Sequence, residues 1–165
     1  MNKGYSLVES LIVITIIIIL TVITAPFYAE ARAQLALDRS ASRLAQDIRF
    51  VLEKTLSAET ACSVFRHGVH FAEADINQYT LFTDCNSDGD YDLGTDVLIE
   101  EISLEAGVRI HSLTTPNSID VVFYPPDPTV TISGSLVATM TIYSVDYPDK
   151  TRTVTVNEVG LIDVD

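Results

Sequence analysis

A run of acidic side chains between residues 84 and 96 is the part of the sequence best suited to binding a metal ion. Counted from Asp84, oxygen-bearing side chains occupy positions one, three, five and nine, as in a calcium loop, and Gly89 at position six permits a sharp turn. Position twelve is Thr95, where a bidentate glutamate belongs, and Asp96 comes one residue late. The segment is therefore either a weak calcium site or an Asx-rich hairpin turn with solvated carboxylates. The candidate ligands are Asp84, Asn86, Asp88, Asp90, Asp92 and Asp96.

Two cysteines, Cys62 and Cys85, could carry redox chemistry. Two are too few for a disulfide scaffold, but they can form one bridge if the domain is exported. Closing their separation of 23 residues (85 − 62) would contribute about 3 kcal/mol by the loop-entropy estimate. The alternative is a pair of buried free thiols.

The three histidines do not form a recognisable metal or catalytic set. His67 and His70 are three residues apart in an alternating segment, so their side chains should point to opposite faces of a strand. His111 is expected at the surface or hydrogen-bonded within a sheet. The sequence contains no nucleophile elbow, zinc-protease motif, paired-cysteine motif or phosphate-binding loop, so we expect no enzymatic activity.

Glu9 is a carboxylate within an apolar segment. Leu11 to Ala25 contains no charge, and the 24 residues from Tyr5 to Tyr28 are interrupted only by Glu9. This run can span a bilayer if Glu9 lies near one face, and Lys3 before it favours a cytoplasmic amino end. An intramembrane carboxylate costs roughly 3 kcal/mol and persists only with a partner.

A secretory signal peptide is the alternative interpretation of this segment. Ala29-Glu30-Ala31 offers a cleavage site between small residues. Cleavage after Ala31 would release a secreted β-rich module that binds its partners in a calcium-dependent way. Glu9 argues against this alternative, because an ordinary signal peptide has no use for a carboxylate at the start of its apolar core.

The run Gly4-Tyr5-Ser6-Leu7-Val8-Glu9, followed by Ile, Leu and Val residues and by Pro26, resembles the prepilin leader of type IV pilins and type II secretion pseudopilins. In that family a membrane peptidase cuts after the glycine and methylates the new amino terminus. The resemblance implies cleavage between Gly4 and Tyr5 and a methylated Tyr5. It also implies that Glu9 pairs with the terminal amine of a neighbouring subunit and sets its axial register, which supplies the partner that the carboxylate needs.

Beyond the apolar run, residues 30–56 contain neither glycine nor proline and predict an amphipathic helix. Pro26 predicts either a bend at the membrane exit or the end of the first helix, and the helical pattern that follows favours the bend. A helix continuous from Tyr5 to Thr55 would be about 76 Å long. The apolar positions are Leu37, Ala41, Leu44, Ile48, Val51, Leu52 and Thr55.

After Ser57 the pattern changes to alternating, β-branched residues separated by turn-forming segments. One helix followed by many short strands predicts an α+β fold, with an antiparallel sheet wrapped on the helix. The predicted strands are Cys62–Phe71, Gln78–Thr83, Asp96–Ile102, Val108–Leu113, Ile119–Tyr124, Thr129–Ser133, Leu136–Val145, Lys150–Asn157 and Leu161–Val164.

Four segments of this head are similar to the FimT and GspH branch of minor pilins and pseudopilins. They are Phe65 to Phe71, Tyr79 to Asp84 with its Asp/Gly-rich loop, Leu104 to Ile110, and Val156 to Ile162. Some members of the branch bind DNA through a basic carboxy-terminal motif, whereas this chain ends in Asp163-Val164-Asp165. DNA binding is therefore not expected.

The net charge of the head also argues against DNA binding. The formal net charge is −13, and residues 61–165, with 17 acids and 4 bases, carry all of it (4 − 17 = −13). Such a head repels phosphate groups and favours cations or basic partners.

These observations predict a leader at 1–4, a transmembrane and filament-core helix at 5–28, an amphipathic helix at 29–57, and an acidic β-rich head at 58–165. The resemblance implies a subunit of a type IV pilus or a type II secretion pseudopilus, with Gly4, Tyr5, Glu9 and Pro26 as its processing and assembly residues. Before assembly the precursor would lie in the inner membrane with its head outside the cytoplasm. The implied partners are other subunits, the prepilin peptidase, the inner-membrane assembly platform and membrane lipid.

Overall fold

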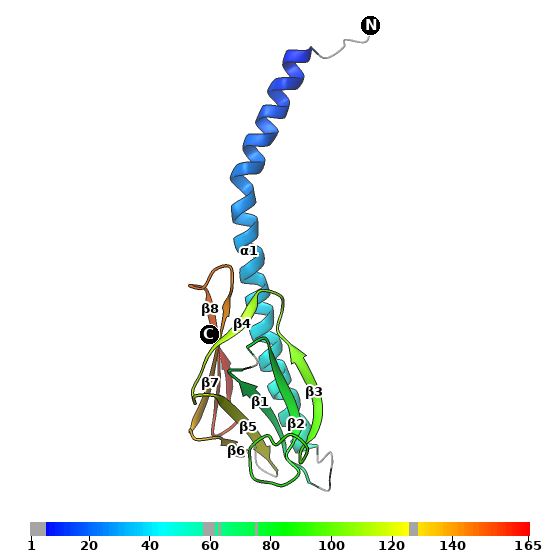
Figure 1. The fold of residues 1–165 in the computed structure, drawn as a ribbon, viewed down its shortest axis with the longest axis vertical. Helices are drawn as coiled ribbons and strands as arrows, with labels where there is room; N and C mark the ends of the chain where they lie inside the picture. Colours follow the sequence, from blue (N-terminus) through cyan, green and yellow to red (C-terminus); the bar gives the residue numbers. More distant parts are fainter. Residues whose placement is uncertain (1–5, 58–61, 63, 75, 126–128) are drawn as a thin grey trace.

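A single long helix carries a β-rich head in the computed structural model, which describes residues 6–57, 62, 64–74, 76–125 and 129–165 (Figure 1). Helix α1 spans Leu7–Leu56, 50 residues or about 75 Å, and its amino-terminal half projects beyond the head. The helix runs unbroken through position 26, so termination there is wrong. Figure 1 shows a gentle curvature of α1 in place of a sharp bend.

The carboxy-terminal half of α1 packs against the head as the spacing of its apolar residues predicts. Leu37, Ala41, Leu44, Ile48 and Val51 are all buried and form one stripe at helical spacing. The hydroxyl of the last predicted position, Thr55, is also buried and donates to a backbone carbonyl one turn earlier, 3.0 Å away. The helix ends at Leu56, and Ser57 caps it.

Nine strands follow within the described residues, and each overlaps one of the predicted ranges. Eight of them begin within one residue of the predicted start. The strands are β1 (His67–Ala72), β2 (Gln78–Thr83), β3 (Val97–Ser103), β4 (Val108–Leu113), β5 (Ser118–Tyr124), β6 (Thr129–Ile132), β7 (Val137–Ser144), β8 (Thr151–Asn157) and β9 (Ile162–Val164).

The first strand is the exception, because it begins at His67, five residues after the predicted start at Cys62. Cys62 has a positive φ of 45°, which is incompatible with an extended strand. The carbonyl of Arg66 already accepts a hydrogen bond from the N–H of Asp84, 3.1 Å away. The residue before β1 is therefore hydrogen-bonded to the start of the 84–96 loop.

The strands form two antiparallel sheets, which corrects the expectation of one. The first has the order β3-β2-β1-β5-β6 and the second the order β4-β7-β8-β9. Because adjacent strands rotate by roughly 20°, one nine-stranded sheet would turn away from a single straight helix, whereas two shorter sheets can each keep a face on it. Both sheets line one core against α1. Their contributions include Val69, Phe71, Leu81, Ile119, Phe123, Ala138, Met140, Ile142, Val154 and Val156.

Candidate functional site

The apolar half of α1 has no packing partner among the described residues. Its most apolar 18-residue window has a mean hydropathy of 2.7 and is 0% buried. The large aliphatic side chains from Leu7 to Ile23 are between 49% and 81% exposed. The helix is long and apolar enough to cross a membrane, and an exposed apolar surface of this size is typical of contact with lipid or with other apolar helices.

Glu9 lies in the first turn of this half, on an exposed position. The hydroxyls of Thr15, Thr21 and Thr24 each donate a hydrogen bond to a backbone carbonyl of α1 one turn earlier, at 2.8 to 3.0 Å. Glu9, in contrast, forms no hydrogen bond or ion pair within the part of the chain that is described. Gly4 and Tyr5, the predicted processing residues, lie outside the described residues.

Two ion pairs fix the middle of α1 to the β7–β8 hairpin. Lys150 lies 2.6 Å from the carboxylate of Glu30, and Arg152 lies 2.8 Å from that of Asp38. Lys150 also donates to the side-chain oxygen of Gln34 at 3.3 Å. The hairpin thus holds the helix just beyond the apolar segment, where the head begins.

A buried tyrosine fixes the other side of the helix. Tyr79 on β2 donates its hydroxyl to the Asp47 carboxylate at 2.5 Å, and Arg43 lies 3.7 Å from the same carboxylate. Burial and the neighbouring Asp47 raise the pKa of Tyr79 well above its ordinary value. Tyr79 therefore stays a neutral donor throughout the physiological pH range.

In the 84–96 loop the carboxylates mainly bind backbone N–H groups of the loop itself. Buried Asp84 accepts from the N–H of Ser87 at 2.5 Å and of Gly89 at 3.1 Å. Asp96 accepts from the N–H of Cys85 at 2.9 Å and of Asp92 at 2.8 Å. All four oxygens of these two carboxylates accept hydrogen bonds. This is the bonding expected of an Asx-rich turn, one of the two interpretations of the loop sequence.

Two other carboxylates of the loop, Asp88 and Asp92, lie around one amide. The side-chain nitrogen of Asn86 donates to Asp88 at 2.6 Å and to Asp92 at 3.2 Å. Within the described residues, no three His, Cys, Asp or Glu side chains are arranged to hold a metal ion. Calcium binding by this loop stays a prediction.

Burial raises the pKa of Asp84 above its ordinary value, although its N–H donors oppose that shift. The pKa of Asp90 is raised by burial first and then by repulsion from Asp120, Asp88 and Asp92. The loop is therefore electrostatically strained when all of its carboxylates are ionised.

The loop packs on the face of the first sheet that is turned away from α1, a placement that the sequence did not indicate. Tyr91 lies 5.0 Å from the ring of Phe82 and 4.9 Å from that of His70, between ring centroids. Gly68 makes the close packing beneath them possible, because a Cβ there would lie 2.8 Å from the Phe82 ring and 2.9 Å from Val122. These residues form a second, smaller core under the loop.

Two histidines that were assigned to opposite strand faces have different partners. His67 is buried and lies 3.0 Å from the Thr83 hydroxyl, whereas the Nδ1 atom of His70 lies 2.7 Å from the Asp120 carboxylate. His111 is exposed and contacts the Tyr143 ring. The His70–Asp120 pair joins residues 50 apart in the chain, and no sequence signal marked Asp120.

The loop is also tied at its base. Cys62 and Cys85 form a disulfide with their Cα atoms 5.8 Å apart. Arg66 stacks on the Tyr124 ring at 4.4 Å and donates to the carbonyl of Ser87 at 2.8 Å. These links all lie at the end of the first sheet where β1 begins and β2 and β5 end, because His67 is opposite Thr83 and Phe123.

Known structures share this architecture. The type IV minor pilin FimU of Pseudomonas aeruginosa matches in two crystal forms at 10% sequence identity. In each form the match covers 78% of this chain; it covers 87% of the FimU chain with a TM-score of 0.55 in one form and 92% with a TM-score of 0.53 in the other. The minor pseudopilin EpsH from the type 2 secretion system of Vibrio cholerae matches at 17% identity over 78% of this chain and 95% of its own, with a TM-score of 0.50.

No family model and no curated protein matches the sequence. The likeness therefore concerns the fold, and it confirms the predicted α+β class with a long amino-terminal helix on an antiparallel head. This chain has the fold of the type IV minor pilins and minor pseudopilins.

Proposed function

We propose that this chain is a structural, non-enzymatic subunit of a type IV pilus or a type II secretion pseudopilus. The observation that carries the proposal is the apolar half of α1, which is 0% buried over its most apolar window and is joined to a head with the minor-pilin fold. A filament whose core is a bundle of such helices would bury this surface. Other pilin or pseudopilin subunits are the corresponding partners.

The proposed precursor spans the inner membrane once, with its acidic head outside the cytoplasm, and contacts lipid until assembly. A prepilin peptidase cuts it after Gly4 and methylates Tyr5. The assembly platform in the same membrane then moves the mature chain into the filament. The sequence Gly4-Tyr5-Ser6-Leu7-Val8-Glu9 supports these steps.

Glu9 is the residue to which we assign axial register. It is exposed on the apolar half and has no partner within the described residues, so a cation from outside the subunit can reach it. The free α-amine of a neighbouring mature chain is such a cation. In an apolar filament core, leaving the carboxylate unpaired would cost several kcal/mol.

The Glu9 assignment is tested by comparing Glu9→Ala and Glu9→Leu with a matched control, Ser10→Ala, in cells that assemble the filament. All three variants should enter the membrane fraction, because the apolar run remains intact. The two Glu9 variants should be reduced at least tenfold in the sheared filament fraction, and the control should match the parent. Normal incorporation of Glu9→Leu would refute the role.

A further inference from the structure

Four charged side chains line one groove beside α1, at the end of the head nearest the apolar half of the helix. The groove has a volume of about 480 Å³. Arg32 and Arg39 come from α1, Glu105 from the turn before β4, and Asp146 from the β7–β8 turn. None of the four forms an ion pair with a described residue. The groove is neutral overall, and its charges match an occupant that carries both signs.

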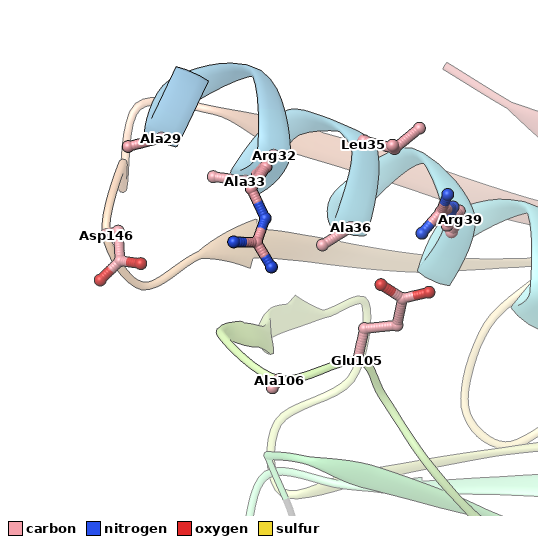
Figure 2. Close-up of a pocket in the computed structure, with 9 residues that line it drawn as sticks. All are labelled: Ala29, Arg32, Ala33, Leu35, Ala36, Arg39, Glu105, Ala106 and Asp146. Atoms are coloured by element: carbon pink, nitrogen blue, oxygen red, sulfur yellow. The ribbon is translucent and has the colours of Figure 1, made fainter. Parts of the chain in front are cut away.

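Figure 2 shows how the two signs are arranged along the groove. Arg32 and Asp146 lie toward its amino-terminal end, next to Ala29, and Arg39 and Glu105 lie toward its carboxy-terminal end. The Arg32 side chain extends from the helix toward the turns that carry the two carboxylates. Each end of the groove therefore presents one guanidinium and one carboxylate.

The walls of the groove are fixed by contacts that do not involve these four side chains. The N–H of Val145 donates to the carbonyl of Gly107 at 2.8 Å, which joins the β7–β8 turn to the turn before β4. Lys150 joins the β7–β8 turn to α1 through Glu30, at 2.6 Å. The fold itself therefore forms the groove, which lowers the ordering cost of binding an occupant.

The position of the groove along α1 places its amino-terminal end at the surface of a bilayer. The hydrocarbon core is about 30 Å thick and the headgroups bring the total to roughly 40 to 45 Å, so each headgroup layer is about 5 to 7 Å thick. The uncharged run ends at Ala25, and Ala29 follows it by four residues, or about 6 Å of helix. With Ala25 at the edge of the hydrocarbon core, Ala29 lies in the headgroup layer.

The side chain of Arg32 points back toward the membrane. Helical side chains lean toward the amino terminus of their helix, and the Arg32 guanidinium lies 5.7 Å from the centroid of the Tyr28 ring, one turn earlier. Tyr28 is exposed and follows the apolar run, a position where tyrosine is typical of the membrane interface. The guanidinium of Arg32 therefore reaches the layer of lipid phosphates.

Asp146 belongs to the part of the head that lies at the same level. In Figure 1 the β7–β8 hairpin reaches farther along α1 toward its apolar half than the other strands do. Lys150 in this hairpin pairs with Glu30, which is five residues, or about 8 Å of helix, beyond Ala25. A carboxylate therefore faces the headgroup layer beside the guanidinium.

We propose that the amino-terminal end of the groove binds a lipid headgroup that carries both a phosphate and a primary ammonium, as phosphatidylethanolamine does. Arg32 donates hydrogen bonds to the phosphate, and Asp146 accepts one from the ammonium. Phosphatidylglycerol offers Asp146 no cation, and the trimethylammonium of phosphatidylcholine has no N–H to donate. The inference rests on the single membrane span of the proposed function, and the contact holds the head of the precursor against the bilayer before assembly.

The site is tested with the full chain in vesicles that contain equal amounts of phosphatidylethanolamine, phosphatidylglycerol and phosphatidylcholine. The chain is extracted in mild detergent, and the lipids that stay bound are counted by native mass spectrometry. We expect phosphatidylethanolamine to be retained at least threefold over each of the other two lipids. Arg32→Gln and Asp146→Asn should each bring that ratio close to one.

Arg39→Gln and Glu105→Gln are the matched controls, because they remove the same kinds of charge from the other end of the same groove. Arg39 is 14 residues, or about 21 Å of helix, beyond Ala25, which places it outside the headgroup layer. Both controls should keep the lipid ratio of the parent. All of the substituted side chains are exposed, so the variants should fold.

A second measurement locates the ammonium of the lipid. A carbodiimide added to the vesicles joins a carboxylate to a primary amine in contact with it, forming an amide with loss of water. Peptide mass mapping should find the lipid attached at Asp146 and at least fivefold less of it at Glu105. Arg32→Gln should lower the yield at Asp146 severalfold, because the phosphate is then no longer held.

The outcomes separate the lipid site from the proposed function. Equal retention of the three lipids, preference for phosphatidylglycerol, or equal losses in Arg32→Gln and Arg39→Gln would overturn the lipid site and leave the membrane span intact. A chain that fails to float with the vesicles would overturn the proposed membrane placement itself.

Discussion

At the residue scale, the polar groups of the head are matched to partners far away in the sequence. Among the described residues, no buried side-chain nitrogen or oxygen lacks a hydrogen-bond partner. The sequence placed His67 and His70 on opposite strand faces, because alternation is local. It did not pair Tyr79 with Asp47 or His70 with Asp120, because these contacts join residues 32 and 50 apart and leave no periodic pattern.

Tyr79→Phe should destabilise the head by about 1 to 2 kcal/mol, because it removes the hydroxyl donor from a charged, partly buried carboxylate. Chemical denaturation of the full chain in detergent measures the change. Tyr143→Phe is the control, since the Tyr143 hydroxyl has no hydrogen bond to any residue that the structure describes. Equal effects of the two substitutions would show that the Tyr79–Asp47 bond contributes nothing specific.

Asp90→Asn should stabilise the head at pH 7 and have little effect below about pH 4. The pKa of Asp90 is raised in the folded chain above its unfolded value, near 3.9, so ionising Asp90 costs more in the folded chain than in the unfolded one. This loss of stability is absent below the unfolded pKa and is complete once the pH has risen through the folded pKa. Asparagine has no such loss. Thermal midpoints of parent and variant from pH 3.5 to 7.5 check this, and a gain that is the same at every pH would contradict it.

At the element scale, the helix and strands were largely predictable and their grouping was not. The three-and-four spacing from Leu37 to Val51 marks the buried stripe of α1, and alternation marks the strands. The split into two sheets depends on twist and on contacts across the whole head. The 84–96 loop was recognised by composition, but its packing through Tyr91 onto Phe82 depends on the space above Gly68, which only the folded sheet creates.

Replacing both Cys62 and Cys85 by serine should lower the free energy of unfolding by about 3 kcal/mol, because the unfolded chain then gains the entropy of an open loop. Denaturation of parent and variant gives the difference. Thiol titration of the exported parent, unfolded without reductant, should find no free thiol. Two thiols per chain would show that the bridge does not form in the exported protein.

Calcium in excess should raise the thermal midpoint of the head if the loop binds it, since a bound cation offsets the repulsion among the loop carboxylates. Asp88→Ala should abolish the increase, and Asp163→Ala on β9, outside the loop, should preserve it. An unchanged midpoint in the parent would exclude the site and leave the loop as an Asx-rich turn.

At the scale of the whole molecule, an electroneutral, apolar rod is joined to a head that carries the entire charge of −13. Removal of the leader also removes Lys3, so the mature chain would carry −14. Heads repeated along a filament repel one another, and salt screens this repulsion over about 8 Å at physiological ionic strength.

The amino-terminal sequence and mass of the mature chain, isolated from the filament fraction, distinguish a filament subunit from a secreted module. A filament subunit should begin at methylated Tyr5 and retain the whole of α1. A chain that begins at Arg32 would contradict the filament assignment, because the apolar half would then have been removed as a signal peptide and only the secreted head would remain.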